Sequence, residues 1–523
     1  MNTANFLAIP AAILPEQEVV VFEGARFTYQ QTLARVQRLA AAFAELGLGR
    51  GDAIAAVDTN SHRYLEAYYA AAAVGAVFVP VNYRAKRPEL HHMLHAAGAR
   101  AVLVGRRYAG EVTGLAGELP ELRHVIGFEA PPPGGGMTVE DLIAGATREQ
   151  EPCEVNEQDT TILMYTSGTT ARPKGVMLTH HDFTTYVCGT VELADGTPRG
   201  TALICVPLYH IAGATGAMTT LFGGRRIVMM RQFDAATWLR LVEEERVTHA
   251  FLVPTMVKQL LDAPDFARRD LSSLESLSYG GAAMPLAVIR RAIATFPPTV
   301  GFVNAFGQTE TTSTLTILGP DDHRLTGDAA AVERKLRRLT SIGRPLPDVE
   351  LAIVDDAGHA VATGAIGEIV VRTPRVMKGY AGGGGRDVVD AEGWLHTRDM
   401  GWLDEAGYVF LAGRKDDMII RGGENIAPAE VEATLQLHPD VEEAAVVGVP
   451  DVEWGQRVAA AIALRPGARV TAAELVEFCR ARLASFKKPE VVRFFPALPK
   501  NPMGKILRRD IRAALGAAEA AHE

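Results

Sequence analysis

The sequence predicts an α/β protein with two domains. The larger, N-terminal domain is expected to hold two mostly parallel sheets covered by helices, together with a small β-rich subdomain, and a small α+β domain follows. Three observations predict this class. The chain of 523 residues is too long for one hydrophobic core. Short apolar runs alternate with helical patterns as far as Ser341. Strands and turns then dominate, and short helices and strands are mixed after Gly413.

The first alternating series begins with a helix. Thr28 is a suitable N-cap, apolar residues recur at spacings of three and four from Leu33 to Leu46, and Gly47 is a suitable terminator. Strand and helix segments alternate beyond it, which indicates parallel strands because each parallel connection needs a crossover. The expected strands are 53–57, 77–81 and 101–104, separated by a helix through Leu65 and Tyr69 and a helix that opens at Pro88.

A second alternating series and two smaller regions complete the chain. Strands are expected at 201–206, 227–230, 249–253, 276–279 and 299–303, with helices such as 234–245 between them. The β-rich subdomain is expected to include strands 351–354 and 368–372 and a loop at 382–385. We place the N-terminal domain at residues 1–415 and the C-terminal domain at residues 416–523.

Composition narrows the classes of function. Hydrophobic residues make up 48% of the chain and charged residues 22%, as in ordinary globular proteins. A net charge of −9 argues against a general nucleic-acid-binding surface. The four cysteines are far apart, which favours reduced thiols in the cytoplasm over disulfides or a zinc site. The sequence shows no secretory signal and no transmembrane segment.

The stretch from Thr160 to Thr179 reads TTILMYTSGTTARPKGVMLT, a short apolar run, a hydroxyl- and glycine-rich loop and a second apolar run. Such a loop suits a polyphosphate, because glycine lets backbone amides approach an anion, hydroxyls donate and lysine adds positive charge. It is not a Walker loop, since Lys174 follows Pro173 and precedes Gly175. Alone, TSGTT is equally compatible with a surface turn. The candidate phosphate-binding residues are Thr166, Ser167, Gly168, Thr169, Thr170 and Lys174.

With further motifs in the same order, the chain resembles the adenylate-forming superfamily, which contains acyl-CoA synthetases, peptide-synthetase adenylation domains and luciferases. The resemblance spans nearly the whole chain. The matching motifs are PLYH at 207–210, GGAA at 280–283, NAFGQTE at 304–310, WLHTRD at 394–399 and PKNPMGKI at 499–506.

The resemblance implies roles for residues of these motifs. Lys505 would bridge the attacking carboxylate and the α-phosphate. Thr309 would donate to that phosphate, Glu310 would hold Mg²⁺, and His210 would lie beside the carboxylate. Asp399 would bind the ribose hydroxyls. Other nucleotide contacts would come from Gly281, Ala282, Ala283, Ala305, Phe306, Gly307 and Arg414.

Three positions depart from the family pattern. Phe306 stands where tyrosine is common, so ring stacking is retained and a hydroxyl contact is lost. Arg398 stands where a small residue is usual. Ala171 replaces a glycine, and we expect a negative φ there because alanine disfavours a positive one.

The same resemblance implies a mobile C-terminal domain and contacts with coenzyme A. Asp416 matches the hinge residue about which that domain rotates. Gly423 would line a pantetheine tunnel, where close main-chain approach requires glycine. Candidate contacts for the CoA nucleotide are Arg84, Trp454, Phe486 and Lys488, although Trp454 and Phe486 also suit the core of the small domain.

These motifs predict an AMP-forming acid–thiol ligase, an acyl-CoA synthetase that uses ATP, Mg²⁺ and CoA with a small carboxylic acid as its partner. An enzyme that loads a carrier-protein thiol is one alternative, and an inactive nucleotide-binding homologue is another. Monomer and homodimer both stay open. The expected acid pocket contains His210, Ile211, Ala212, Phe251, Gly281, Ala305 and Gly307. It holds no Arg or Lys, so we expect an apolar monocarboxylic acid, with fatty acids slightly ahead of aromatic ones.

Overall fold

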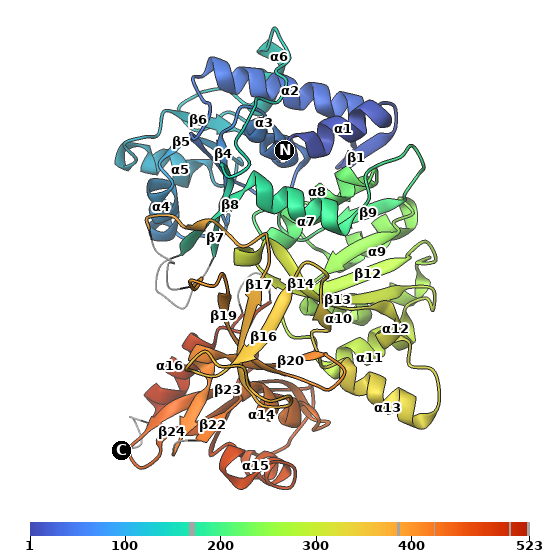
Figure 1. Ribbon diagram of the computed structural model, residues 1–523, viewed down its shortest axis with the longest axis vertical. Coiled ribbons are helices and arrows are strands. Elements are labelled where there is room, and N and C mark those ends of the chain that lie inside the picture. The colour runs from blue at the N-terminus through green and yellow to red at the C-terminus, as the bar shows by residue number, and fades with distance from the viewer. Residues whose placement is uncertain (167–172, 384–387, 423, 501–503, 520–523) are drawn as a thin grey trace.

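The computed structural model describes residues 1–166, 173–383, 388–422, 424–500 and 504–519 (Figure 1). Within them, seven-, nine- and four-stranded sheets precede the two- and three-stranded sheets of the C-terminal part. Figure 1 shows the helix-covered larger sheets above and the C-terminal elements below, with the four-stranded sheet between them. The predicted α/β class, with a β-rich subdomain and a small C-terminal domain, is confirmed.

Local signals set the first long helix. α2 (Tyr29–Glu45) begins at a capping box in which the Thr28 side chain accepts from the Gln31 backbone N–H and Gln31 Oε1 accepts from the Thr28 backbone N–H. Gly47 lies just beyond the helix with a φ of 74°. Both ends of this helix are therefore those that the sequence predicts.

The seven-stranded sheet has the order β18-β8-β7-β4-β3-β5-β6. Its central strands are parallel and are connected by α3 (His62–Ala73), α4 (Arg87–Ala96) and α5 (Ala109–Leu115). Two antiparallel strands, β8 and β18, extend one edge. The strands are β3 (Ala53–Val57), β4 (Val77–Pro80), β5 (Ala99–Val104), β6 (His124–Gly127), β7 (Thr160–Thr166), β8 (Lys174–Thr179) and β18 (Gly379–Tyr380).

The nine-stranded sheet has the order β15-β14-β13-β12-β11-β9-β10-β1-β2, and its strands from β1 to β13 in this order are parallel. The strands are β1 (Glu18–Phe22), β2 (Ala25–Thr28), β9 (Thr201–Ile204), β10 (Arg226–Met229), β11 (His249–Leu252), β12 (Ser276–Gly280), β13 (Gly301–Gln308), β14 (Ser313–Leu318) and β15 (Arg344–Pro345). The main helices between them are α8 (Ile211–Phe222), α9 (Ala235–Glu244), α10 (Pro254–Asp262) and α11 (Leu286–Thr295).

One strand of this sheet differs from its prediction. A strand at 299–303 is expected, but β13 begins at Gly301 and continues to Gln308. The reason is pairing on both sides, since β12 runs parallel to β13 and β14 runs antiparallel to it. Most of the NAFGQTE motif therefore lies within β13, beyond the end of the expected strand.

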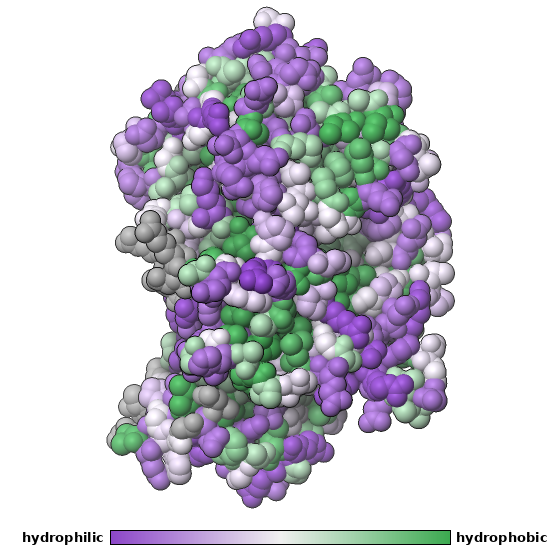
Figure 2. Space-filling view, in the orientation of Figure 1, coloured by the Kyte–Doolittle hydropathy of each residue, from purple (hydrophilic) through white to green (hydrophobic). Residues whose placement is uncertain are grey.

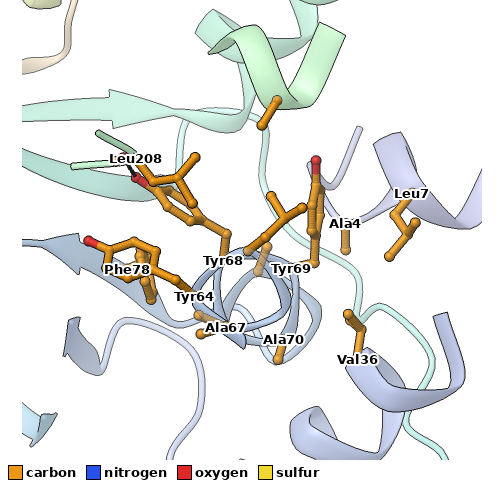
Figure 3. Close-up of a cluster of buried hydrophobic side chains, with 14 of the residues drawn as sticks. Ala4, Leu7, Val36, Tyr64, Ala67, Tyr68, Tyr69, Ala70, Phe78 and Leu208 are labelled. Atoms are coloured by element: carbon orange, nitrogen blue, oxygen red, sulfur yellow. Dashed lines mark hydrogen bonds between the residues drawn. The ribbon is translucent and has the colours of Figure 1, made fainter. Parts of the chain in front are cut away.

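The two large sheets share one core. Figure 3 shows Tyr64, Tyr68 and Tyr69 of α3 packed with Phe78 of β4 and with Leu208, which follows β9. The Tyr68 hydroxyl donates to the Leu208 carbonyl oxygen at 2.6 Å. This contact anchors the loop that leads to His210 against the seven-stranded sheet.

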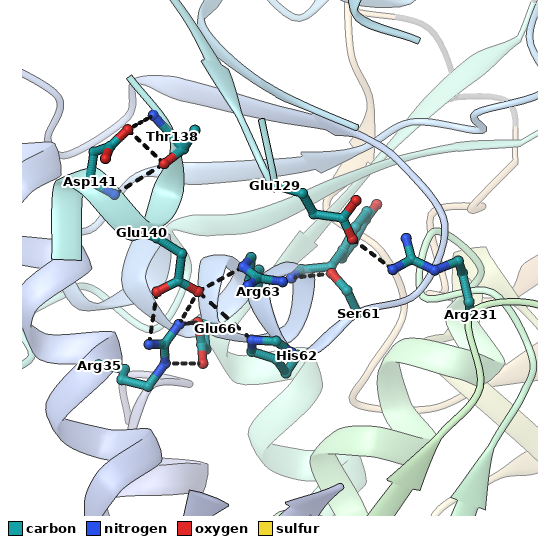
Figure 4. A network of polar contacts seen from close by, with 11 residues as sticks. Arg35, Ser61, His62, Arg63, Glu66, Glu129, Thr138, Glu140, Asp141 and Arg231 are labelled. Carbon is teal, nitrogen blue, oxygen red and sulfur yellow. Dashed lines mark hydrogen bonds and ion pairs between the residues drawn. The ribbon is translucent and has the colours of Figure 1, made fainter. Parts of the chain in front are cut away.

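A buried ionic network fastens the N-terminal helices. Figure 4 shows Arg35 of α2 between Glu66 of α3 and Glu140 of α6 (Val139–Gly145). His62, whose Nε2 lies 3.9 Å from Glu140 Oε1, and the pairing with Arg35 lower the pKa of Glu140, against the opposing effect of burial. This network holds α2, α3 and α6 together.

The β-rich subdomain is an antiparallel sheet of the order β16-β17-β19-β20. Its strands are β16 (Glu350–Val354), β17 (Gly367–Arg372), β19 (Leu395–Leu403) and β20 (Val409–Arg414). Figure 2 shows apolar residues gathered over this sheet, where Leu351, Val361 and Leu403 line a shallow groove of about 220 Å³. Asp399 and Arg414 pair across β19 and β20.

The C-terminal part has its own apolar clusters and docks against α10. Lys258 of α10 lies 2.9 Å from Glu442 of β23. Its elements are β21 (Ile419–Arg421), β22 (Glu424–Ile426), α14 (Pro428–Gln436), β23 (Val441–Asp451), β24 (Gly455–Leu464), α15 (Ala472–Arg480), β25 (Val491–Phe494) and α16 (Arg508–Glu519). None of the helices in the described ranges is long and apolar enough to cross a membrane.

Candidate active site

The predicted phosphate loop joins two paired strands. β7 ends at Thr166 and β8 begins at Lys174, and these two residues are partners in the antiparallel register. The strands expected on either side of the loop are thus present. Most of the loop itself lies outside the described residues. The phosphate contacts expected for Ser167, Gly168, Thr169 and Thr170 therefore stay predictions, and so does the negative φ expected at Ala171.

The carboxyl ends of β11, β12 and β13 bring predicted base and acid contacts together. Gly280 pairs with Ala305, and a Cβ at Gly280 would lie 2.1 Å from the Ala305 carbonyl oxygen and 3.4 Å from the Phe251 ring. Gly281 follows with a φ of 77°, which favours glycine. Glycine is therefore required at 280 by the neighbouring strand and favoured at 281 by the backbone conformation. The same two segments contain Ala282, Ala283, Phe306 and Gly307.

His210 follows β9 and caps α8, which Ile211 and Ala212 open. Its Nδ1 accepts a hydrogen bond from the Ala212 backbone N–H at 3.3 Å. The neighbours of β9 are β10 on one side and β11 on the other, so His210 stands where the strand order reverses, the usual ligand position in open α/β sheets. Burial lowers the pKa of His210 to about 4, and the imidazole is therefore neutral at pH 7.

The lowered pKa of His210 predicts an acid-dependent loss of stability. The unfolded chain takes up this proton near pH 6.5, whereas the folded protein does so only near pH 4. Between these values the unfolded state binds more protons, so the free energy of unfolding falls as the pH falls. His210→Gln cannot be protonated, and its Tm should fall about 2 to 4 °C less than that of the wild type between pH 6.5 and 4.5.

Thermal unfolding followed at several pH values measures this difference. His359→Gln is a matched control, because that side chain is 82% exposed. The same pH slope of Tm in His210→Gln and in the wild type would contradict the prediction.

Thr309 and Glu310 lie in a turn directly after β13. η3 (Thr309–Thr311) is followed by Thr312 with a φ of 49°, and the chain then returns along β14. The Met377 backbone N–H donates to the Glu310 carbonyl oxygen at 2.8 Å, and the Tyr380 hydroxyl donates to Glu310 Oε1 at 3.0 Å. Both the backbone and the carboxylate of Glu310 are therefore held from the segment around β18.

Asp399 is 6% exposed and is bound at both carboxylate oxygens. Arg414 Nε lies 2.8 Å from Oδ1, and Gln308 Nε2 donates to Oδ2 at 2.7 Å. Burial raises the pKa of Asp399, while the charge of Arg414 and the hydrogen bond from Gln308 oppose the rise. The structure thus places the two predicted ribose contacts side by side and adds Gln308 to them.

Lys505 belongs to the C-terminal part, and the charges of this site affect it. The preceding Gly504 packs on α10, where a Cβ would lie 2.5 Å from Thr255 Oγ1. The surface of Lys505 reaches solvent, but the protein around it is dense enough that desolvation lowers its pKa. Arg414 adds to this shift and Asp399 opposes it. The charges of Asp399 and Arg414 therefore act on the ammonium group of Lys505.

Two family models match the chain. The AMP-binding enzyme model covers residues 9–381, and the AMP-binding enzyme C-terminal domain model covers residues 430–505. The chain belongs to the AMP-binding enzyme family. This places it in the adenylate-forming superfamily that its motifs resemble.

Relatives of this AMP-binding enzyme match it over nearly their full length. It is 36% identical to a feruloyl-CoA synthase of Amycolatopsis sp, over 97% of each chain. It is 33% identical to the fatty acid–[acyl-carrier-protein] ligase ScoC of Streptomyces coeruleorubidus, over 95% of this chain and 93% of that protein. The crystal structure of the anthranilate CoA ligase AuaEII with anthranoyl-AMP is similar with a TM-score of 0.87 at 26% identity, covering 99% of this chain and 98% of that chain.

Among the candidate CoA contacts of this AMP-binding enzyme, Trp454 and Phe486 lie close together, whereas Arg84 lies apart from them. Arg421 lies over the Trp454 ring, 5.0 Å from its centroid, and donates to the Phe486 carbonyl oxygen at 3.3 Å. Trp454 is 44% exposed, which excludes the core alternative for this residue. Lys488 donates to the Ser485 carbonyl oxygen. Gly423 lies outside the described residues.

Arg84 belongs to a different part of the surface. Within the described chain it has no hydrogen bond, ion pair or ring contact with the Trp454 cluster, and its guanidinium lies 5.5 Å from the centroid of the Tyr83 ring. The structure therefore brings Trp454 and Phe486 together through Arg421, but not Arg84.

The predicted hinge lies in η4 (Lys415–Asp417), between the four-stranded sheet and the C-terminal part. Arg398 binds the carboxylate of Asp416 through both Nη2 and Nε, whereas Asp417 lies 3.5 Å from Arg508 of α16. Arg398 has a φ of 60°, a left-handed conformation that costs an ordinary residue about 1 kcal/mol. Of two neighbouring residues of η4, Asp416 is thus paired with the four-stranded sheet and Asp417 with the C-terminal part, on either side of the predicted hinge.

Three residues outside the predicted set hold the site. Gln308 contacts Asp399, Tyr380 contacts Glu310, and the fully buried Arg375 donates to the Thr311 carbonyl oxygen at 2.8 Å. The position of Gln308 inside the NAFGQTE motif is a weak signal for its role. No signal in the sequence identifies Arg375 or Tyr380, because their partners are about 64 to 70 residues away along the chain.

Proposed function

We propose that this protein is an acyl-CoA synthetase that converts an apolar monocarboxylic acid and ATP to acyl-AMP and pyrophosphate, and then transfers the acyl group to CoA. One observation carries the proposal. Lys505 of the C-terminal part lies within the electrostatic influence of Asp399 and Arg414, and Glu310 acts on the same aspartate. The feruloyl-CoA synthase and anthranilate CoA ligase relatives support it.

In the first half-reaction a carboxylate oxygen forms a bond to the α-phosphorus, and the bond from that phosphorus to the pyrophosphate oxygen breaks. Lys505 stabilises the negative charge that develops on the α-phosphate, and Thr309 donates to it. Asp399, held by Arg414 and Gln308, accepts from the ribose hydroxyls. Neutral His210 lies beside the acid without adding charge to its pocket.

The residues around Glu310 suit a magnesium ion that shields the phosphates. Among the described residues no three His, Cys, Asp or Glu side chains form a metal cage. Mg²⁺ on a nucleotide commonly takes one or two carboxylates together with phosphate oxygens, and the Glu310 carboxylate can supply such a ligand. Lys174, at the start of β8, would add a positive charge on the phosphate side.

In the second half-reaction the CoA thiol loses its proton, its sulfur bonds to the acyl carbon, and AMP leaves with the former carboxylate oxygen. We place the domains at residues 1–415 and 416–523 and the hinge between them at Asp416. Rotation about this hinge would move Lys505 out of the active site and bring the CoA-binding side of the small domain into it. The exposed Trp454 ring, which lies against Arg421, offers aromatic surface for the CoA nucleotide, while Arg421 itself is paired with Glu490.

A panel of carboxylic acids tests the function. CoA-dependent AMP release should be found with fatty or aromatic monocarboxylic acids, and malonate-type dicarboxylates should be rejected because their second charge would be buried without a partner. Pyrophosphate release without transfer to free CoA, but with transfer to a carrier protein, would favour the alternative that the ScoC relative supports. No pyrophosphate with any acid would indicate an inactive homologue.

Ala305→Leu probes the size of the acid pocket. Ala305 is half-buried next to Gly280 and near Phe251, so the three carbons that leucine adds should fill space that a long or aromatic acyl group needs. We expect kcat/KM for such acids to fall about 10-fold or more relative to short acids. Ala330→Leu, on the exposed face of α13 (Ala329–Arg338), is the control. An equal loss for all chain lengths would reject this pocket.

A further inference from the structure

A short segment outside the predicted motifs is bound to both walls of the phosphate site. β18 pairs with β8, so that Tyr380 lies opposite Val176, and the Ala381 backbone N–H donates to the Gly175 carbonyl oxygen at 2.8 Å. The Met377 backbone N–H donates to the Glu310 carbonyl oxygen at 2.8 Å. This segment therefore connects the strand that begins at Lys174 with the turn that contains Glu310.

Tyr380 makes the corresponding connection with its side chain. Its hydroxyl donates to Glu310 Oε1 at 3.0 Å, and Lys174 Nζ lies 5.2 Å from the centroid of its ring. A phenol ring attracts a cation through its π face while its hydroxyl donates in the ring plane. A single half-buried side chain thus contacts both the candidate metal ligand and the candidate phosphate-binding lysine.

The hydroxyl of Tyr380 restrains the Glu310 carboxylate as a hydrogen-bond donor to one of its two oxygens. A hydrogen bond to one oxygen limits rotation of the Glu310 carboxylate, and a carboxylate that is already oriented loses less entropy when a cation binds.

We propose that Tyr380 is a positioning residue for the magnesium-bound triphosphate, which orients Glu310 through its hydroxyl and Lys174 through its ring. The inference rests on the proposed function, because it takes MgATP as the ligand of this site. Mg²⁺ demands near-ideal ligand geometry, so a misplaced carboxylate weakens metal binding more than it weakens contacts with the nucleotide itself.

Tyr380→Phe separates this role from simple packing, because it keeps the ring that packs against the core and over Lys174 and removes only the hydroxyl. Tyr186→Phe is a matched control. Tyr186 is half-buried, its hydroxyl contacts Thr314 Oγ1 at 3.2 Å, and its ring lies under Arg375, but it contacts neither Glu310 nor Lys174 among the described residues.

Calorimetric titration without carboxylic acid or CoA measures binding directly. We expect Tyr380→Phe to weaken MgATP binding about 5- to 10-fold and to leave the affinity for ATP in EDTA unchanged, as expected for one lost hydrogen bond to a charged group. The Mg²⁺ concentration for half-maximal pyrophosphate release should rise by the same factor. In a Glu310→Gln background, Tyr380→Phe should have little further effect, since the two residues act together.

Two results would overturn the proposal. Equal weakening of MgATP and of metal-free ATP would show that Tyr380 holds the loop rather than the metal ligand, and unchanged MgATP affinity would show no positioning role. Failure of the proposed function is a separate outcome. In that case the wild type would release no pyrophosphate with any acid, whereas the comparison of MgATP with ATP in EDTA could still be made.

Discussion

Lys505→Ala is expected to lower the rate of acyl-adenylate formation about 10²-fold or more, the effect of removing one preorganised electrostatic contact from a transition state. The charges of Arg414 and Asp399, the two candidate ribose contacts, act on Lys505. Alanine leaves the small domain in place but removes the charge that would stabilise the α-phosphate.

Two half-reactions measured apart test this role. Pyrophosphate release from acid and MgATP reports adenylation, and thioester formation from supplied acyl-AMP reports transfer. Transfer should be much less affected, because the proposed rotation of the small domain would carry Lys505 away from the site. Lys500→Ala is the control, since Lys500 lies in the same terminal region and pairs with Glu443 of β23. Equal losses in both half-reactions would refute the assignment of Lys505.

Asp416→Pro should produce the opposite pattern, with adenylation retained and transfer to CoA lost. Asp416 lies in the single turn of η4, where a proline is tolerated because its φ near −65° matches a helical first turn. A proline resists the change of φ that a rotation about this residue requires, so the enzyme should remain in the orientation with Lys505 toward the nucleotide site.

Asp416→Ala distinguishes the backbone effect from loss of the contact with Arg398. Alanine removes that ion pair and leaves φ unrestricted, so transfer should proceed in this variant. Rates of thioester formation from supplied acyl-AMP compare the two variants directly. Normal turnover with CoA in Asp416→Pro would place the hinge at another residue.

Secondary structure was predicted best where local signals are strong. The capping box at Thr28 and the glycine after Leu46 set the ends of α2, and the alternation of apolar and helical segments identified both large sheets. β13 was predicted too short, because its extension depends on β14 returning alongside it, and no local pattern in NAFGQTE shows that partner.

In the candidate site, too, the sequence indicated some residues and missed those that depend on distant segments. The family resemblance implied nucleotide or magnesium contacts for Glu310, Asp399 and Arg414, and the structure places Arg414 beside Asp399. The side chains that hold these residues were not predicted. Gln308 reaches Asp399 from 91 residues away, and Tyr380 reaches Glu310 from 70 residues away. Such contacts depend on which strands become neighbours.

Sequence alone determined the fold class, the family and the residue types available for phosphate, ribose and acid contacts, because apolar periodicity, glycine positions and motif order are properties of the chain itself. Only the tertiary structure decided that the charge of Asp399 acts on Lys505, that Arg398 binds Asp416 at the predicted hinge, and that Tyr380 joins Lys174 to Glu310. These are contacts between distant segments, and their geometry arises only when the sheets and the C-terminal part have packed.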